Sequence, residues 1–133
     1  IPSSVTSIGN TAFQKCTSLM SITIPDGVTA IADNTFNGCS SLTSVVIPDS
    51  VTTIGKNAFK GCKSLESINL PENVKCDKKT FKDCKNLKKV VCNPGLKDIG
   101  SWAFEGCTSL TDITYGTDTV VSPQAFESKM LNS

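Results

Sequence analysis

The sequence has no histidine and no arginine, and all 13 basic residues among its 133 positions are lysines. Histidine is the most common catalytic base and metal ligand, so neither a Ser-His-Asp nor a Cys-His set can form. Without arginine there is no bidentate recognition of phosphate or guanine, and the net charge of +1 gives no general attraction to nucleic acid. We therefore expect no enzymatic activity, no cofactor, no metal and no nucleic-acid partner.

Long apolar segments are also missing. No stretch is long and apolar enough to cross a bilayer, and no basic-then-apolar signal opens the chain. The first residues, Ile1 and Pro2, correspond to the middle of a repeat that recurs along the whole sequence. We expect no membrane insertion, and we expect the chain to be a fragment of a longer protein.

Phenylalanine recurs at intervals of 22 or 23 residues. It occupies positions Phe13, Phe36, Phe59, Phe81, Phe104 and Phe126. A cysteine follows each of the first five phenylalanines by three residues, and a leucine follows each of those cysteines by three more. The unit reads Pro-x-x-Val-x-x-Ile-Gly-x-x-Ala-Phe-x-x-Cys-x-x-Leu-x-x-Ile-x-Ile. A repeat of this length predicts a solenoid in which neighbouring copies bury each other's apolar faces.

Each part of the unit predicts a local structure. The Leu-x-x-Ile-x-Ile stretch alternates as a half-buried strand does, and proline then ends that strand. Val-x-x-Ile suits a second, shorter extended segment. Gly9, Gly55 and Gly100 permit a tight bend after it. Asn-x-Ala-Phe-x-x-Cys predicts a helical or 3₁₀ turn. The expected fold is a mainly β solenoid with short helical or 3₁₀ turns and five to six rungs.

The repeats form a single array over residues 1–133. The copies span about 2–24, 25–47, 48–70, 71–93 and 94–115, followed by a partial copy at 116–133. The fourth copy is one residue short before Cys76, which takes the place of an isoleucine, and an extra Asn93 restores the register. We expect loops to absorb both changes. The end rungs should offer bare strand edges, which favours end-to-end self-association of the fragment.

The seven cysteines are odd in number and include no Cys-x-x-Cys pair. Five occupy one repeat position, and Cys76 and Cys92 replace apolar residues. We interpret all seven as buried, small apolar thiols rather than as a metal site. The alternative is a single adventitious disulfide, or an exposed Cys16 at the end of the array.

Lysines concentrate in the fourth repeat, which contains seven lysines and only three acidic residues. They are Lys75, Lys78, Lys79, Lys82, Lys85, Lys88 and Lys89, against Glu72, Asp77 and Asp83. One interpretation is a patch for an acidic partner, a sulfated glycan or an anionic surface. The other is an ordinary solvated outer face. Only Lys88 and Lys89 fall within the predicted strand.

The outward positions of the predicted strands are the best candidates for binding, because solenoids offer such rows as extended surfaces. The candidate residues are Ser21, Thr23, Ser44, Val46, Ser67, Asn69, Lys88, Lys89, Val91, Asp112 and Thr114. None is aromatic, so a single module should bind weakly and a longer array should gain from avidity. The alternative is that these are solubilising strand residues without a ligand. Trp102 is either a surface contact or a partly packed turn residue, and Tyr115 is expected in the core.

The repeat resembles the BspA-like class of leucine-rich repeats. The likeness rests on Ile-Pro-Ser-Ser-Val-Thr-Ser-Ile-Gly at 1–9, Leu-Thr-Ser-Val-Val-Ile-Pro at 42–48 and Ile-Pro-Asp-Ser-Val-Thr-Thr-Ile-Gly-Lys-Asn-Ala-Phe-Lys-Gly-Cys at 47–62. It covers nearly the whole chain. The resemblance implies a curved leucine-rich-repeat solenoid with a strand-lined concave face, in a cell-surface or secreted protein. Members occur in mucosal bacteria and parasitic protists, and some are adhesins for host fibronectin or fibrinogen.

These observations lead to one functional hypothesis and two alternatives. We expect a non-catalytic protein-binding or adhesion module that recognises a host matrix or plasma protein through its concave strand face. The first alternative is an intracellular scaffold or regulatory repeat. The second is a structural spacer that carries another domain.

Overall fold

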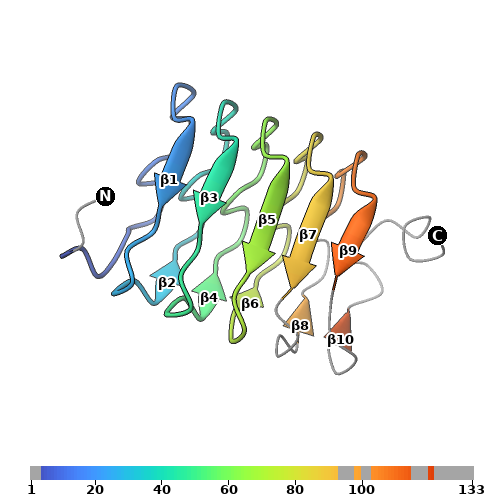
Figure 1. The fold of residues 1–133 in the computed structure, drawn as a ribbon. Helices are drawn as coiled ribbons and strands as arrows, with labels where there is room; N and C mark the ends of the chain where they lie inside the picture. The colour runs from blue at the N-terminus through green and yellow to red at the C-terminus, as the bar shows by residue number, and fades with distance from the viewer. Residues whose placement is uncertain (1–3, 93–97, 100–102, 115–119, 122–133) are drawn as a thin grey trace.

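The structure, a computed structural model, describes residues 4–92, 98–99, 103–114 and 120–121. The expectations for Asn93, Trp102 and Tyr115, and for most of the partial copy at 116–133, lie outside these residues. The chain winds as a parallel β-solenoid, and each turn of the solenoid, here called a rung, contributes one longer and one shorter strand (Figure 1). The predicted repeat architecture is confirmed.

The longer strands lie side by side along one side of the solenoid, here called the strand face (Figure 1). They are β1 (Ser21–Thr23), β3 (Ser44–Val46), β5 (Ser67–Leu70), β7 (Lys89–Cys92) and β9 (Asp112–Thr114). β1 pairs with β3, β5 with β7 and β7 with β9, all in parallel. No strand ladder joins β3 to β5 among these described strands, so the face consists of a two-stranded and a three-stranded sheet.

The shorter strands form a second parallel sheet, which is continuous. They are β2 (Ala30–Ile31), β4 (Thr53–Ile54), β6 (Lys75–Cys76), β8 (Asp98–Ile99) and β10 (Val120–Val121). Cys76 pairs with Ile54 on one side and with Ile99 on the other. It therefore does occupy the isoleucine position.

The segment around each phenylalanine differs from the predicted helical or 3₁₀ turn. Some of its N–H groups do bond three residues back, as that of Cys16 does to the Phe13 carbonyl at 3.1 Å. Residues with positive φ interrupt this pattern, because a right-handed helix cannot contain them. They occur two positions before or after a phenylalanine, at Thr11, Lys15, Asn34, Gly38, Asn57, Gly61, Lys79, Asp83 and Gly106. No helix forms among the described residues.

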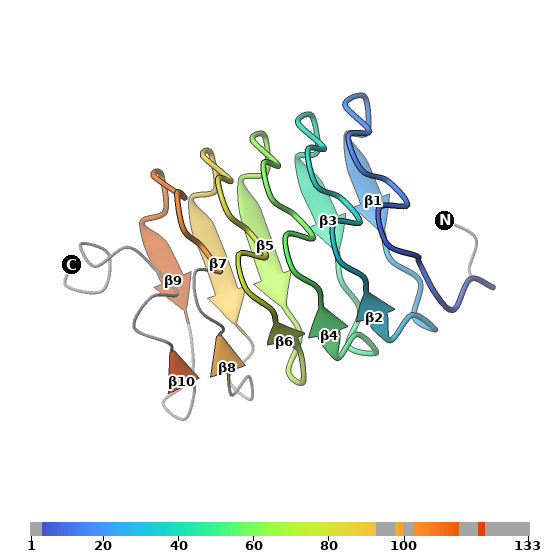
Figure 2. The same ribbon diagram turned by 180° about the vertical axis from the view of Figure 1, so that it is seen from behind.

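These left-handed residues direct alternate N–H groups toward the next rung. The Phe13 N–H donates to the Thr35 carbonyl at 2.9 Å, and the Lys15 N–H donates to the Asn37 carbonyl at 2.7 Å. Equivalent bonds recur in the following rungs. The turns thus form a further ladder along the solenoid, on the side seen in Figure 2. The exposed side of residues 9–18, 32–41, 55–64, 77–86 and 103–109 is here called the turn face.

The core is a set of apolar columns that run along the solenoid between the sheets and the turns. The rings of Phe13, Phe36, Phe59, Phe81 and Phe104 stack in one column, with successive centroids 5.1–5.4 Å apart and interplanar angles of 2–11°. This spacing is close to the distance of roughly 4.8 Å between neighbouring strands, so each rung supplies one ring. Phe13 is half-buried because no described rung covers it, whereas the other four rings are fully buried.

Candidate functional site

The strand face presents the outward residues that the sequence predicts. Its burial alternates along each strand: in β5, Ile68 and Leu70 are buried whereas Ser67 and Asn69 are exposed. Ten of the eleven candidate residues are exposed, and Val91 is half-buried. Lys88 directly precedes β7 instead of lying within it. The alternation predicted from the Leu-x-x-Ile-x-Ile pattern is therefore confirmed.

Parallel pairing gathers these residues into rows across the strand face. Ser21 lies opposite Ser44 and Thr23 opposite Val46. The strand pairing is interrupted between the adjacent strands β3 and β5, and this interruption is here called the gap. Beyond it, one row contains Ser67, Lys89 and Asp112, and the next contains Asn69, Val91 and Thr114. The candidate residues therefore form two groups, one on each side of that gap.

An open depression of about 350 Å³ lies at the carboxyl ends of β5, β7 and β9. It is lined by Ile47, Asp49, Asn69, Leu70, Pro71, Val91, Cys92 and Thr114. Three of these, Asn69, Val91 and Thr114, are among the candidate residues. The others were not predicted, because the alternation assigns Leu70 and Cys92 to the core and gives no sign that their edges remain accessible where the strands end.

A second depression, of about 430 Å³, follows the shorter strands β2, β4 and β6. Its lining includes the outward residues Ala30, Thr53 and Lys75 and the acidic residues Asp33 and Asp77. The repeat pattern did not predict this depression. Its strands contribute only two residues each, so it offers a narrower surface than the strand face does.

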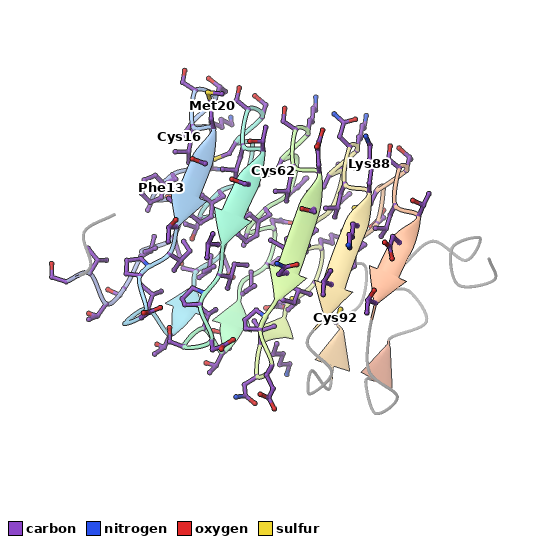
Figure 3. The ribbon with its side chains drawn as sticks, viewed as in Figure 1. Phe13, Cys16, Met20, Cys62, Lys88 and Cys92 are labelled. Carbon is purple, nitrogen blue, oxygen red and sulfur yellow. The ribbon has the colours of Figure 1, made fainter. Side chains whose placement is uncertain are left out.

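Exposed apolar side chains lie at the first two rungs of the strand face. Met20, just before β1, is 65% exposed, and Val46 in β3 is 57% exposed. They are the large hydrophobic residues with the greatest exposure in the described part of the chain, and Figure 3 shows Met20 near the upper end of β1. Exposed aliphatic groups of this kind can contribute to contact with a protein partner.

The lysines of the strand face lie beside acidic residues. The Lys88 N–H donates to the Glu66 carbonyl at 2.8 Å, which places the two residues on adjacent rungs (Figure 3). Lys89 in β7 pairs in register with Asp112 in β9. Neighbouring opposite charges reduce the net potential here. The strand face is therefore mixed in charge.

The recurring cysteine is a structural group that joins successive rungs. The thiols of Cys39, Cys62, Cys84 and Cys107 each donate a hydrogen bond to the carbonyl of the phenylalanine in the preceding rung, at 3.1–3.3 Å. Six of the seven cysteines are buried, and Cys16, in the first rung, is half-buried. The prediction of buried thiols holds for those six, and the placement of Cys16 follows from its position at the end of the array.

Burial keeps these thiols protonated at neutral pH. It raises the pKa of Cys62 to about 12 and that of Cys92 to about 11, from an ordinary value of 9.0. The pKa of Cys84 also lies well above that value, because the neighbouring Cys107 thiol and burial both disfavour its thiolate. The thiolate is the nucleophile and the metal ligand, so these cysteines are poor in both roles.

In the part of the chain that the structure describes, no group of three or more acidic or cysteine side chains is arranged to hold a metal ion. No helix in the same part of the chain has the length and apolar character required to span a membrane.

Sequence comparison gives the family of the chain. The profile described as the BspA type leucine rich repeat region matches residues 6–132, with six copies. The match covers almost the full length and has the same period as the rungs. The chain belongs to the BspA-type leucine-rich repeat family.

Solved structures of several bacterial proteins share this fold. A leucine-rich cell surface protein from Faecalibacterium prausnitzii A2-165 is 28% identical, with a TM-score of 0.82 over 99% of this chain. A leucine-rich repeat protein from Bacteroides ovatus is 32% identical, with a TM-score of 0.67 over 92% of this chain. The pneumococcal vaccine antigen PcpA is 24% identical with a TM-score of 0.88 over 95%, a likeness that shows the fold alone.

This BspA-type array is short beside those structures. It spans 33% of the Faecalibacterium protein, 40% of the Bacteroides protein and 32% of PcpA. No functionally curated protein matches it. The comparisons thus establish the repeat family and its fold, and relate the chain to repeat domains of bacterial surface-type proteins.

Proposed function

We propose that this chain is a non-catalytic module that binds a protein through its strand face, as part of a cell-surface or secreted protein. The observation that carries the proposal is the strand face itself. Five parallel strands present rows of small polar residues, two exposed aliphatic residues and an open depression of about 350 Å³. The cysteines, which are the strongest nucleophiles in the sequence, are mostly buried and protonated.

Two further points support this role and suggest the partner. One similar structure is that of a leucine-rich cell surface protein, which agrees with a surface location. The partner that we propose is a host matrix or plasma protein such as fibronectin or fibrinogen. In a longer array we propose that the strand face is the concave one and that repeated weak contacts add by avidity.

The test is binding of the purified chain to immobilised fibronectin and fibrinogen at low and physiological salt. The strand-face variant Val46→Arg/Asn69→Arg places one large charged side chain on each side of the gap between β3 and β5. The matched control is Thr29→Arg/Thr53→Arg, which makes equally exposed changes on the second sheet and beside it. We expect saturable binding by the parent chain, retained by the control and weakened at least tenfold in the strand-face variant.

Two outcomes would contradict the proposal. One is the absence of saturable binding to either protein. The other is equal binding by the two double variants, which would show that the strand face does not make the contact. Circular dichroism and thermal unfolding of both variants confirm that the fold is intact.

End-to-end association is a separate part of the proposal. Among the described strands β1 pairs only with β3, so its other edge is bare. Unpaired strand edges are templates for further pairing. Sedimentation velocity across a concentration series should show oligomers. The Ile24 N–H donates to the Val46 carbonyl of β3, so by alternation the N–H of Thr23 faces the bare edge. A proline at Thr23 should therefore reduce the oligomers, whereas concentration-independent monomers would contradict the idea.

A further inference from the structure

Six lysines occupy matched positions on the turn face of the third and fourth rungs. They form three pairs, each separated by 22 residues: Lys56 and Lys78, Lys60 and Lys82, and Lys63 and Lys85. We call these six residues the lysine band. Four of the six are exposed and two are half-buried.

The backbone brings the members of two of the pairs close together. The Gly61 N–H donates to the Lys82 carbonyl at 2.8 Å, and the Asn57 N–H donates to the Lys78 carbonyl at 3.4 Å. Hydrogen-bonded neighbours of this kind lie about 5 Å apart. The two rungs therefore place like charges beside each other, an arrangement that costs stability unless an anion compensates it.

The nearby carboxylates offset only part of the charge of the six lysines. Asp33 accepts the Lys56 backbone N–H at 2.8 Å, and Asp77 accepts the Lys78 backbone N–H at 2.7 Å, so both are used to hold the turns. A carboxylate oxygen of Asp83 lies against Gly106 in the fifth rung, on the side away from the third rung. No ion pair involves a lysine of the band, all of which belong to the described residues.

Charge is also segregated along the solenoid. Residues 55–92 contain ten lysines and four acidic residues, whereas residues 4–54 contain one lysine and three. The described residues beyond 92 contain three acidic residues and no lysine. The turn position held by Lys60 and Lys82 is Asn37 in the second rung and Glu105 in the fifth. The band is thus a positive strip two rungs wide with neutral or acidic neighbours on both sides.

We propose that the lysine band binds a sulfated polysaccharide chain that lies parallel to the rungs. Lysine is a point charge with three donors, and it satisfies oxyanions at many angles. Two parallel rows of ammonium groups suit a linear chain with anionic groups along both of its sides. Sulfated polysaccharides have that form, whereas polysaccharides with only carboxylates carry their charges more sparsely. This inference concerns a different face from the proposed protein-binding site and does not depend on it.

Other anionic partners fit the band less well. A nucleic acid strand would be expected to stack its bases on aromatic rings, and the repeat places its phenylalanines in the core. A duplex or a membrane surface is wider than the strip, which is roughly 10 Å across, and would meet the acidic neighbours Asp33 and Glu105. A protein partner would be expected to bury apolar anchors, whereas the most exposed large hydrophobic residues of the described chain, Met20 and Val46, lie on the strand face.

The test is binding of the intact chain to heparin, measured by surface plasmon resonance. The salt concentration is varied from roughly 50 to 300 mM, a range over which the screening of exposed charges increases. The band variant is Lys60→Gln/Lys82→Gln/Lys85→Gln. The matched control, Lys75→Gln/Lys88→Gln/Lys89→Gln, removes the same charge from lysines outside the band. We expect the band variant to bind about 100-fold more weakly, the change that corresponds to roughly 1 kcal/mol for each lysine, with a shallower dependence on salt. The control should change only a few-fold.

Parallel measurements distinguish the ligands. De-sulfated heparin, hyaluronan, duplex DNA and vesicles containing phosphatidylserine should each bind much more weakly than heparin. Equal losses in the two triple variants, no binding of heparin, or equal binding of DNA or vesicles would each overturn the proposal. The strand-face variant Val46→Arg/Asn69→Arg should leave heparin binding intact, so failure of the protein-binding proposal would be recognised separately.

Discussion

Gly55 and Gly9 occupy the same position of the repeat, yet the structure predicts opposite effects when each is changed to alanine. A Cβ at Gly55 would lie 2.6 Å from the Asp33 nitrogen and 2.8 Å from the Ala32 carbonyl carbon, and it would also collide with a carboxylate oxygen of Asp33. A Cβ at Gly9 would have no atom within 4 Å. The difference arises because Gly55 packs on the backbone of the preceding rung, whereas no described rung precedes Gly9.

The size of the effect at Gly55 follows from two contributions. Overpacking against backbone atoms costs about 1–3 kcal/mol, because the backbone cannot rotate away as a flexible side chain can. The Asp33 carboxylate would have to move, and it accepts the Lys56 N–H at 2.8 Å, a bond whose loss costs about 1 kcal/mol. We expect Gly55→Ala to lower the free energy of unfolding by about 2–4 kcal/mol. At roughly 3 °C per kcal/mol, Tm should fall by about 6–12 °C.

Gly9→Ala is the matched control. Alanine reduces the conformational freedom of the unfolded chain, so this change should leave Tm unchanged or raise it by a few degrees. Urea unfolding followed by circular dichroism gives the free energies, and a thermal scan gives Tm. Equal effects of the two substitutions would refute the reasoning, because they would show that contact with the preceding rung does not restrict Gly55.

Three further predictions concern the turns, the thiols and the core. Lys15→Gly should stabilise the fold by about 1 kcal/mol, because Lys15 has a φ of 58° that glycine adopts without strain. Gly38→Ala, at a φ of 80°, should destabilise the fold by about 1–2 kcal/mol. Urea unfolding of both variants tests whether these positions are left-handed. Burial raises the pKa of Cys62 to about 12 from 9.0, so this thiol ionises at a lower pH in the unfolded chain than in the folded one. The free energy of unfolding should therefore be unaffected below about pH 9 and should fall as the pH rises from about 9 to 12. Unfolding curves at several alkaline pH values measure this, and a flat profile would contradict the buried position. Phe59→Ala should lower the free energy of unfolding by about 3–5 kcal/mol, because Phe59 is fully buried between two rings. Phe13→Ala should lower it clearly less, because Phe13 is half-buried. Equal decreases in chemical unfolding would argue against the stacked column.

The periodic apolar residues made the architecture predictable. Phe, Cys, Leu and the paired strand residues recur because equivalent positions of each rung face the same core, so one sequence reveals the column without any structure. Cys76 illustrates how far this reasoning extends. Its assignment to an isoleucine position required only the count of residues, and the pairing with Ile54 and Ile99 confirms it.

The turns were harder to predict because spacing alone does not reveal the sign of φ. A three-residue spacing of apolar groups is compatible with a helix. Only a comparison of equivalent repeat positions across the copies, here called columns, suggests otherwise. The position two residues after phenylalanine holds glycine at Gly38, Gly61 and Gly106, all with positive φ. Lys15 and Asp83 occupy the same column with the same conformation, and they obscure the glycine signal.

The surface features were predictable only in part. The outward residues of the strands follow from alternation, and the structure places them as predicted. The gap between β3 and β5 and the depression beside Leu70 depend on the exact paths of strands and loops, which the repeat pattern does not specify. The lysine band was visible in the sequence as a cluster in the fourth repeat. Its extension into the third rung, through Lys56, Lys60 and Lys63, required knowledge of which positions lie side by side.

The direction of the hydrogen bonds between rungs has a mechanical consequence. The bonds of the three sheets and of the turns run along the solenoid axis, and each rung contacts only its neighbours. A pull applied to the two ends of such an array therefore acts along these bonds, and because each rung contacts only its neighbours, rungs detach one at a time. Each rung of 22 or 23 residues releases roughly 70 Å of extended chain as it detaches. An array built in this way lengthens in steps under tension, and the rungs that remain folded keep their surfaces unchanged.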